Sequence, residues 1–168
     1  MVRGRRLRLG MLVTVLPLLP ALALLYFRPL GGDPPIRLEV SLADRQLRVM
    51  QGADVVKSYD IAIGRPSHPT PTGRFRTGKI VWNPSWRPPP EDWARDLEYQ
   101  PPGAAGNPMQ GVKIYFSAPD YYIHGTNDPE SIGEAASHGC IRMTVADALD
   151  LARRIRRAGS GVALRISD

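Results

Sequence analysis

The sequence predicts a mainly β domain, a β-sandwich or open barrel with one prominent helix, preceded by an apolar amino-terminal helix. Three observations support this. Short runs with an apolar residue at every second position recur from Ile36 onward, as is typical of half-buried strands. A later segment, 144–159, has the apolar spacing of an amphipathic helix. Residues 9–27 carry no charge at all.

Length and charge limit the classes of protein to consider. The 168 residues suffice for one domain with a hydrophobic core. The net charge is +6, but five of the 22 basic residues precede Asp33, the first acidic one, which leaves 17 basic against 16 acidic residues. The body of the chain is therefore nearly neutral, and this argues against a nucleic-acid-binding face.

The amino terminus has the features of an export signal. The basic start MVRGRRLR is followed by an apolar stretch as long as a membrane span, and basic flanks usually stay in the cytoplasm. A cleaved signal peptide, with Ala-Leu-Ala at 21–23, and an uncleaved anchor both fit. A buried core helix is the alternative. We expect a signal anchor or signal peptide at 1–28, a linker at 29–35, and an exported, periplasmic or otherwise extracytoplasmic domain at 36–168.

The first strands are predicted to form an antiparallel meander. Apolar and polar residues alternate over 36–42 and again over 47–49, with a turn at 43–46 between the two runs. A second turn at 51–54 leads to a third alternating run, 59–63, which ends at a glycine. Tight turns between consecutive strands favour antiparallel neighbours.

The rest of the chain combines loops and short strands with the helix. Seven prolines and two tryptophans between 84 and 110 predict a long, ordered flap. Thr144, with Asp147 three positions on, suits a helix start, and Gly159 suits its end. The remaining expected elements are a proline-broken loop at 65–75 and strands at 75–82, 112–116, 121–123 and 162–166.

The segment 123–143 concentrates groups that can carry chemistry. It holds His124, His138 and the chain's only cysteine, Cys140. In an oxidising compartment a single cysteine indicates either an intermolecular link or a reactive thiol. A thiol needs a neighbouring base to become a thiolate at neutral pH. Backbone N–H groups around residues 138–140 could stabilise an oxyanion.

Three interpretations of this segment remain open on spacing alone. A cysteine nucleophile could use either histidine, one of them two residues away and the other sixteen. The same three side chains could hold a catalytic zinc ion, although no recognised metal-binding spacing is present. A purely structural turn is the third interpretation. His68, between prolines, is interpreted as a solvated loop residue.

The motif IHGT…SHGCIRM resembles the active-site motif of L,D-transpeptidase catalytic domains of the YkuD type. The segments TPTGRF, NPSW and GNPMQGVKIYFS are also similar to the family's strands and turns, so the resemblance covers about 36–167. It implies that Cys140 is the nucleophile and His124 the general base and acid. It also implies that the backbone carbonyl of Gly125 orients the imidazole, and that no metal or organic cofactor takes part.

The same resemblance implies roles for the residues around Cys140. His138 and Gly139 would shape the turn and contribute to the oxyanion site, with support from Ser137. Arg142, Tyr122 and Trp86 are candidates for substrate binding. For Arg142, a bond to a substrate carboxylate and a structural ion pair are both open. Two departures from the family's common form, around PPGAAGNPMQG and RAGSGVALRI, lie in predicted loops.

The activity implied by the resemblance is peptidoglycan cross-linking. The cysteine would take the acyl group of a tetrapeptide stem, release D-alanine, and pass the acyl group to an amine of another stem or of a wall-attached protein. Transfer to water instead would make the protein an L,D-carboxypeptidase. Carbapenem inhibitors are expected to acylate the same cysteine. A zinc hydrolase and a non-catalytic wall-binding module are the alternatives.

Overall fold

The computed structural model describes residues 34–118, 121–159 and 161–168, all of them within one unit, Asp33–Asp168. The predicted signal segment, 1–28, and most of the predicted linker lie outside the described residues. Over the part of the chain that is described, no helix is long and apolar enough to cross a membrane.

The first of two main sheets contains five strands in the order β3-β2-β1-β11-β5. The predicted meander is confirmed, because β1 pairs with β2 and β2 with β3, both antiparallel. The chain's last strand, β11, pairs with β1 in parallel and with β5 in antiparallel orientation. The bounds are β1 Ile36–Ser41, β2 Gln46–Gln51, β3 Asp54–Asp60, β5 Gly73–Arg76 and β11 Ala163–Ser167.

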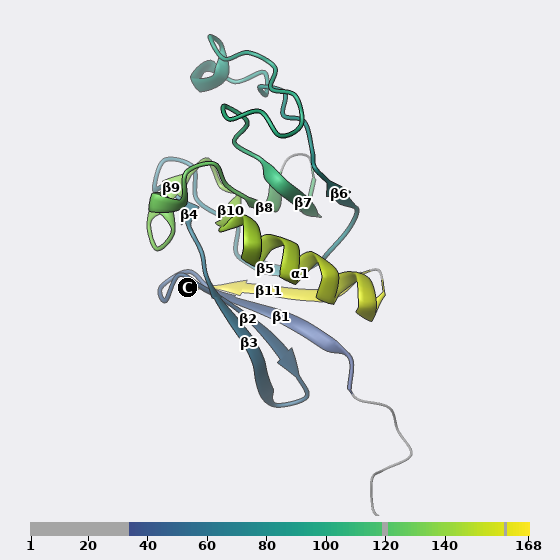
Figure 1. The fold of residues 1–168 in the computed structure, drawn as a ribbon. Coiled ribbons are helices and arrows are strands. Elements are labelled where there is room, and N and C mark those ends of the chain that lie inside the picture. Colours follow the sequence, from purple (N-terminus) through teal and green to yellow (C-terminus); the bar gives the residue numbers. More distant parts are fainter. Residues whose placement is uncertain (1–33, 119–120, 160) are drawn as a thin grey trace, which may run out of the picture. The chain divides into compact units, whose positions relative to one another are not determined.

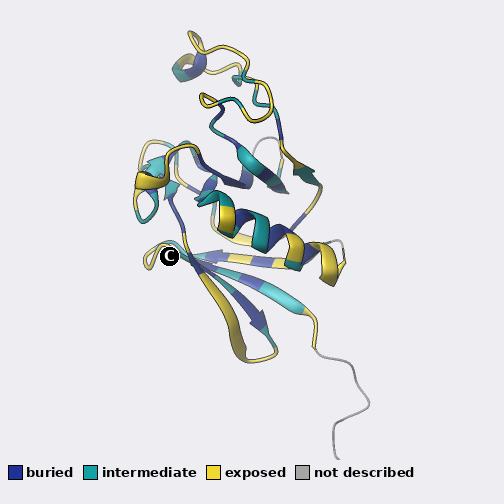
Figure 2. Ribbon diagram, in the orientation of Figure 1, coloured by how far each residue is buried: buried dark blue, intermediate teal, exposed yellow. Residues whose placement is uncertain are grey.

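The third predicted strand was placed wrongly. We expected one run over 59–63, whereas β3 begins at Asp54 and ends at Asp60, and Ile63–Gly64 forms a separate strand, β4. The physical reason is that β3 is an edge strand on which only Tyr59 is buried, so most of it lacks an apolar alternation. In Figure 2 this strand is coloured as exposed along most of its length.

The second main sheet has four strands in the order β10-β8-β7-β6. Its central pair, β7 and β8, is antiparallel, whereas β10 pairs with β8 in parallel. A small parallel pair joins β4 to β9. The bounds are β6 Ile80–Trp82, β7 Gln110–Ser117, β8 Tyr121–Gly125, β9 Ala135–Ser137 and β10 Ile141–Met143.

The predicted helix is α1, Val145–Ala158, the one α-helix among the described residues. Thr144 caps it, since its hydroxyl oxygen accepts a hydrogen bond from the Asp147 N–H at 3.2 Å. One face of the helix packs against β7 and β8 (Figure 1). The Tyr59 hydroxyl donates to an Asp150 carboxylate oxygen at 2.6 Å, which ties the helix to the five-stranded sheet as well.

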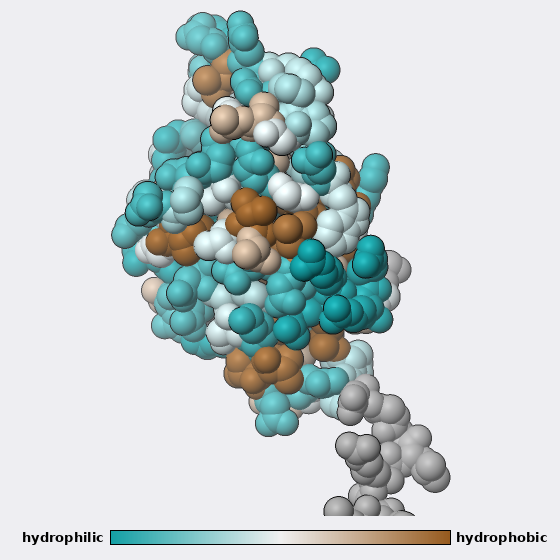
Figure 3. Space-filling model, viewed as in Figure 1, coloured by the Kyte–Doolittle hydropathy of each residue, from teal (hydrophilic) through white to brown (hydrophobic). Residues whose placement is uncertain are grey.

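Both main sheets and the helix contribute to one hydrophobic core. Leu38 and Val49 come from the first sheet, Ile114 and Ile123 from the second, and Leu151 from the helix, and all are almost fully buried. Burying a side chain of this size contributes about 1.5–3 kcal/mol. The visible surface is mostly hydrophilic, with small separate apolar areas (Figure 3). The prediction of a mainly β domain with one prominent helix is thus confirmed.

Residues 84–109, called the flap below, form the ordered segment that the tryptophans predicted. The flap projects from the four-stranded sheet between β6 and β7 (Figure 1). Its backbone is held by the buried Asn107, whose amide donates to the carbonyls of Pro84 at 2.8 Å and Pro101 at 3.1 Å. A short 3-10 helix, Asp92–Ala94, is the regular element within it.

Candidate active site

The candidate site lies on the face of the four-stranded sheet that points away from the core. In β8, Ile123 faces the core, so its neighbours Tyr122 and His124 point to the opposite face. Arg142 in β10 stands opposite His124, and Lys113 in β7 stands opposite it on the other side. Cys140 directly precedes β10, in the turn that follows β9.

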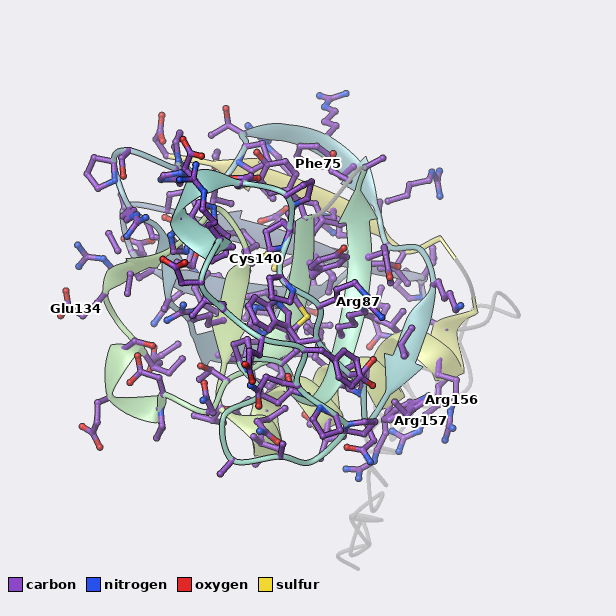
Figure 4. The ribbon with its side chains drawn as sticks, turned by 90° about the horizontal axis from the view of Figure 1, so that it is seen from above. Phe75, Arg87, Glu134, Cys140, Arg156 and Arg157 are labelled. Carbon is purple, nitrogen blue, oxygen red and sulfur yellow. The ribbon has the colours of Figure 1, made fainter. Side chains whose placement is uncertain are left out.

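A pocket of about 660 Å³ lies between this face and the flap. His124, His138 and Cys140 line it, together with flap residues that include Trp86 and Trp93. Figure 4, seen from above, shows Cys140 near the middle of the domain, whereas Glu134, Arg156 and Arg157 lie at the periphery. The candidate nucleophile is half-buried and lines this pocket.

The buried His124 is held in one tautomer. Its Nδ1 lies 3.0 Å from the backbone carbonyl oxygen of Gly125. Because a carbonyl oxygen can only accept a hydrogen bond, Nδ1 carries the proton and Nε2 keeps its lone pair. Burial lowers the pKa of His124 to about 4; the hydrogen bond to the Gly125 carbonyl opposes this shift, and the charges of Arg142 and Lys113 add to it. The ring is therefore neutral at pH 7 and can accept a proton.

Gly125 is needed for this arrangement for steric reasons. A Cβ atom at this position would lie 2.4 Å from the Gln110 carbonyl oxygen and 3.2 Å from Cα of Val145, the first residue of α1. Strand β7 and the helix start can approach this closely only because no side chain is present. The close packing fixes the carbonyl group that orients His124.

The Ser-His-Gly-Cys turn is closed by its serine. Ser137 Oγ donates to the Cys140 carbonyl at 2.6 Å and accepts from the Gly139 N–H at 3.0 Å. Gly139 has a φ of +102°, and a Cβ there would lie 2.6 Å from a ring carbon of Tyr121. The Gly139 N–H, one of the donors considered for an oxyanion, is thus directed to Ser137 within the turn in this structure.

His138 is surrounded differently from His124. Its Nε2 is hydrogen-bonded to a guanidinium nitrogen of Arg65, and its ring stacks on Trp93 with centroids 3.7 Å apart and planes 14° apart. Because arginine only donates, Nε2 is the acceptor in this bond. Burial, followed by the charge of Arg65, lowers the pKa of His138 to about 4. His138 is neutral at pH 7, and its acceptor nitrogen, Nε2, already accepts the hydrogen bond from Arg65.

The structure brings together most of the side chains that the sequence singled out. Seven of the nine predicted site residues line the pocket: Trp86, Tyr122, His124, Ser137, His138, Cys140 and Arg142. The other two, Gly125 and Gly139, act through their backbones: the Gly125 carbonyl accepts from His124, and the Gly139 N–H donates to Ser137. His68, which we interpreted as a solvated loop residue, is partly exposed, and its ring lies 4.9 Å from that of His138 between centroids.

Sequence reasoning missed Arg65 and Trp93, which both contact His138. Trp93 had a weak signal, an aromatic residue in a proline-rich segment, and Arg65 had none.

The described ranges contain no group of three His, Cys, Asp or Glu side chains that could hold a metal ion such as zinc. Arg142 lies 3.6 Å from an Asp128 carboxylate oxygen and 3.5 Å from Ser131 Oγ.

Comparisons with known proteins agree with this geometry. The family model for the L,D-transpeptidase catalytic domain matches residues 35–162. The YkuD protein of Bacillus licheniformis is 37% identical over 118 residues, which are 70% of this chain and 59% of that protein. The YqjB protein of Bacillus subtilis is 34% identical over 120 residues, 68% of this chain and 62% of that protein. The chain thus spans about 60% of the length of these relatives.

Solved structures show the same fold at low sequence identity. L,D-transpeptidase 3 from Mycobacterium tuberculosis has a TM-score of 0.62 at 16% identity, over 80% of this chain and 62% of that one. The L,D-transpeptidase LdtMt1 in complex with imipenem has a TM-score of 0.61 at 17% identity, over 81% of this chain and 60% of that one. With the family model covering most of its length, the chain belongs to the L,D-transpeptidase catalytic domain family, the YkuD family.

Proposed function

We propose that this domain is a peptidoglycan L,D-transpeptidase that works through an acyl-enzyme on Cys140. The observation that carries the proposal is the neutral, oriented His124, which lines the same pocket as Cys140. A thiol and a neutral histidine that line one pocket are the two groups that nucleophilic catalysis by cysteine requires. Family membership supports the reaction class.

In the first half of the reaction, His124 Nε2 takes the proton of the Cys140 thiol. The thiolate attacks the carbonyl carbon of the third residue of a tetrapeptide stem, and a tetrahedral intermediate forms. This collapses to a thioester, and the protonated His124 gives its proton to the nitrogen of the departing D-alanine. His138 is unsuited to this task, because its acceptor nitrogen is already bonded to Arg65.

In the second half, an amine from another stem or from a wall-attached protein attacks the thioester. Nε2 of His124 takes the proton that the amine loses, a new amide bond forms, and Cys140 leaves as a thiolate that recovers the proton from His124. Neither half needs a redox partner. Water in place of the amine would give a free carboxylate and make the domain an L,D-carboxypeptidase.

The test is incubation of the full chain with a disaccharide-tetrapeptide, followed by mass spectrometry. We expect loss of D-alanine together with a cross-linked dimer, and no conversion by a Cys140→Ala variant. Loss of D-alanine without a dimer would assign the carboxypeptidase activity. A Cys140→Ala variant as active as the parent would overturn the cysteine mechanism. Zinc at one equivalent per purified chain would instead favour the hydrolase alternative.

Arg142 is proposed to bind a carboxylate of the stem peptide. Arg142 pairs with His124 in the sheet and lines the pocket, and its contacts to Asp128 and Ser131 are long for hydrogen bonds. A planar guanidinium with donors to spare can bind a carboxylate through two bonds. Tyr122 and Trp86, which line the same pocket, are proposed to contact the rest of the substrate.

The role of Arg142 predicts a change in KM rather than in kcat. An Arg142→Gln variant should raise KM for the tetrapeptide by roughly tenfold, the loss of one charge-assisted bond, while kcat changes little. Asp128→Asn is the matched control, because it removes the ion pair and keeps the guanidinium. If both variants leave KM unchanged and lower the unfolding temperature equally, Arg142 has only a structural role.

A further inference from the structure

We propose that Trp93 is a specificity-determining residue, which closes the flap onto His138 and so limits access of water to the acyl-enzyme on Cys140. This inference rests on the proposed function, since it concerns the fate of the thioester. It starts from a contact that neither the motif nor the cysteine mechanism requires. That contact joins the flap to the turn that carries the candidate nucleophile.

The indole of Trp93 is held in one orientation from the flap side. Trp93 lies in the 3-10 helix Asp92–Ala94, and the neighbouring Ala94 is buried. Its Nε1 donates to a Glu91 carboxylate oxygen at 2.6 Å. The same ring stacks on His138 almost in parallel, at 3.7 Å between centroids. Three prolines, 88–90, precede this segment and restrict its backbone.

The His138 ring is a fixed platform for this stack. Arg65 is hydrogen-bonded to Nε2 of His138, and the backbone N–H of Arg65 donates to the Ser137 carbonyl at 3.0 Å. His68 contacts the ring edge. With two neighbouring side chains and the turn itself holding it, His138 has little freedom to follow a moving flap. The movable partner in the stack is therefore Trp93.

The stack lies beside the reacting atoms. Trp93, His138 and Cys140 line the same pocket, and His138 is two residues before Cys140. A stem peptide has to enter beneath the flap, so the flap opens and closes during the reaction. A closed cover prevents hydrolysis of a reactive intermediate. One aromatic pair is weak enough to break in each cycle, yet it favours the closed state between substrates.

The chain's single cysteine allows a test that does not depend on the proposed reaction. The rate at which N-ethylmaleimide modifies Cys140 in the full chain reports how often the flap is open. We expect Trp93→Ala to raise this rate roughly two- to tenfold, the population change that loss of one aromatic pair produces. Trp93→Phe keeps an aromatic ring and should stay near the parent rate.

The second measurement is the ratio of hydrolysed to cross-linked product from the disaccharide-tetrapeptide. Trp93→Ala should raise it by a similar factor, and Trp93→Phe should restore the parent ratio, a pattern that general destabilisation would not produce. An unchanged maleimide rate in Trp93→Ala would overturn the proposal whatever the products are. If the parent makes no product but Trp93→Ala still reacts faster with maleimide, the flap closure stands and the proposed function fails.

Discussion

Replacing His124 with glutamine is expected to slow acylation of Cys140 by imipenem at pH 7 by about 10²–10⁴-fold, the usual contribution of a general base. Imipenem is a suitable probe because the family resemblance of the motif implies that a carbapenem acylates Cys140. Glutamine keeps a polar side chain in the buried site but cannot take the thiol proton. The measurement is the growth of the covalent mass adduct of the full chain with time.

The matched control is His138→Gln. A glutamine at this position can still accept the hydrogen bond from Arg65 through its side-chain oxygen, so the turn should keep its shape. We expect a loss in acylation rate of roughly tenfold at most, because His138 supports the site without moving the thiol proton. The opposite ranking of the two variants would reassign the base to His138. Unfolding temperatures measured in parallel separate loss of the base from loss of the fold.

The features that the sequence predicted well are local ones. The first two strands alternate apolar and polar residues because one side of each packs on the core, and this is visible within six residues. The helix was predictable from Thr144 and Asp147 at its start and from its apolar face. The pairing of Cys140 with a histidine also followed from few residues, since the chain has only three histidines.

What the sequence could not predict depends on contacts between distant segments. The parallel pairing of β8 and β10 sets His124 opposite Arg142, and no local pattern specifies that register. The contact of Arg65 with His138 joins residues 73 positions apart. The number of residues between each histidine and Cys140 did not decide which histidine is the base. Their hydrogen-bond partners in the structure distinguish them. One ring has its proton held by a carbonyl, and the other has its lone pair held by an arginine.

The buried, neutral histidines also predict how stability depends on pH. In the unfolded chain a histidine has a pKa near 6.5, whereas His124 and His138 in the folded protein have pKa values of about 4. Between these values the unfolded state binds protons that the folded state does not bind. The free energy of unfolding should therefore fall as the pH drops from about 6.5 to about 4, and these two groups should cause no change above pH 7.

His124 should account for the larger share of this loss although both pKa values are about 4, because its ring is buried, whereas solvent screens the charge of the partly exposed His138. Each unit of pKa difference corresponds to about 1.4 kcal/mol, so its contribution reaches about 3 kcal/mol at pH 4. Urea unfolding at pH 4.5, 5.5, 6.5 and 7.5 measures the slope. His124→Gln should flatten it strongly and His138→Gln only in part. A slope that His124→Gln leaves intact would mean that the ring has the same pKa in the folded and the unfolded chain, which would contradict the lowered pKa of the buried His124.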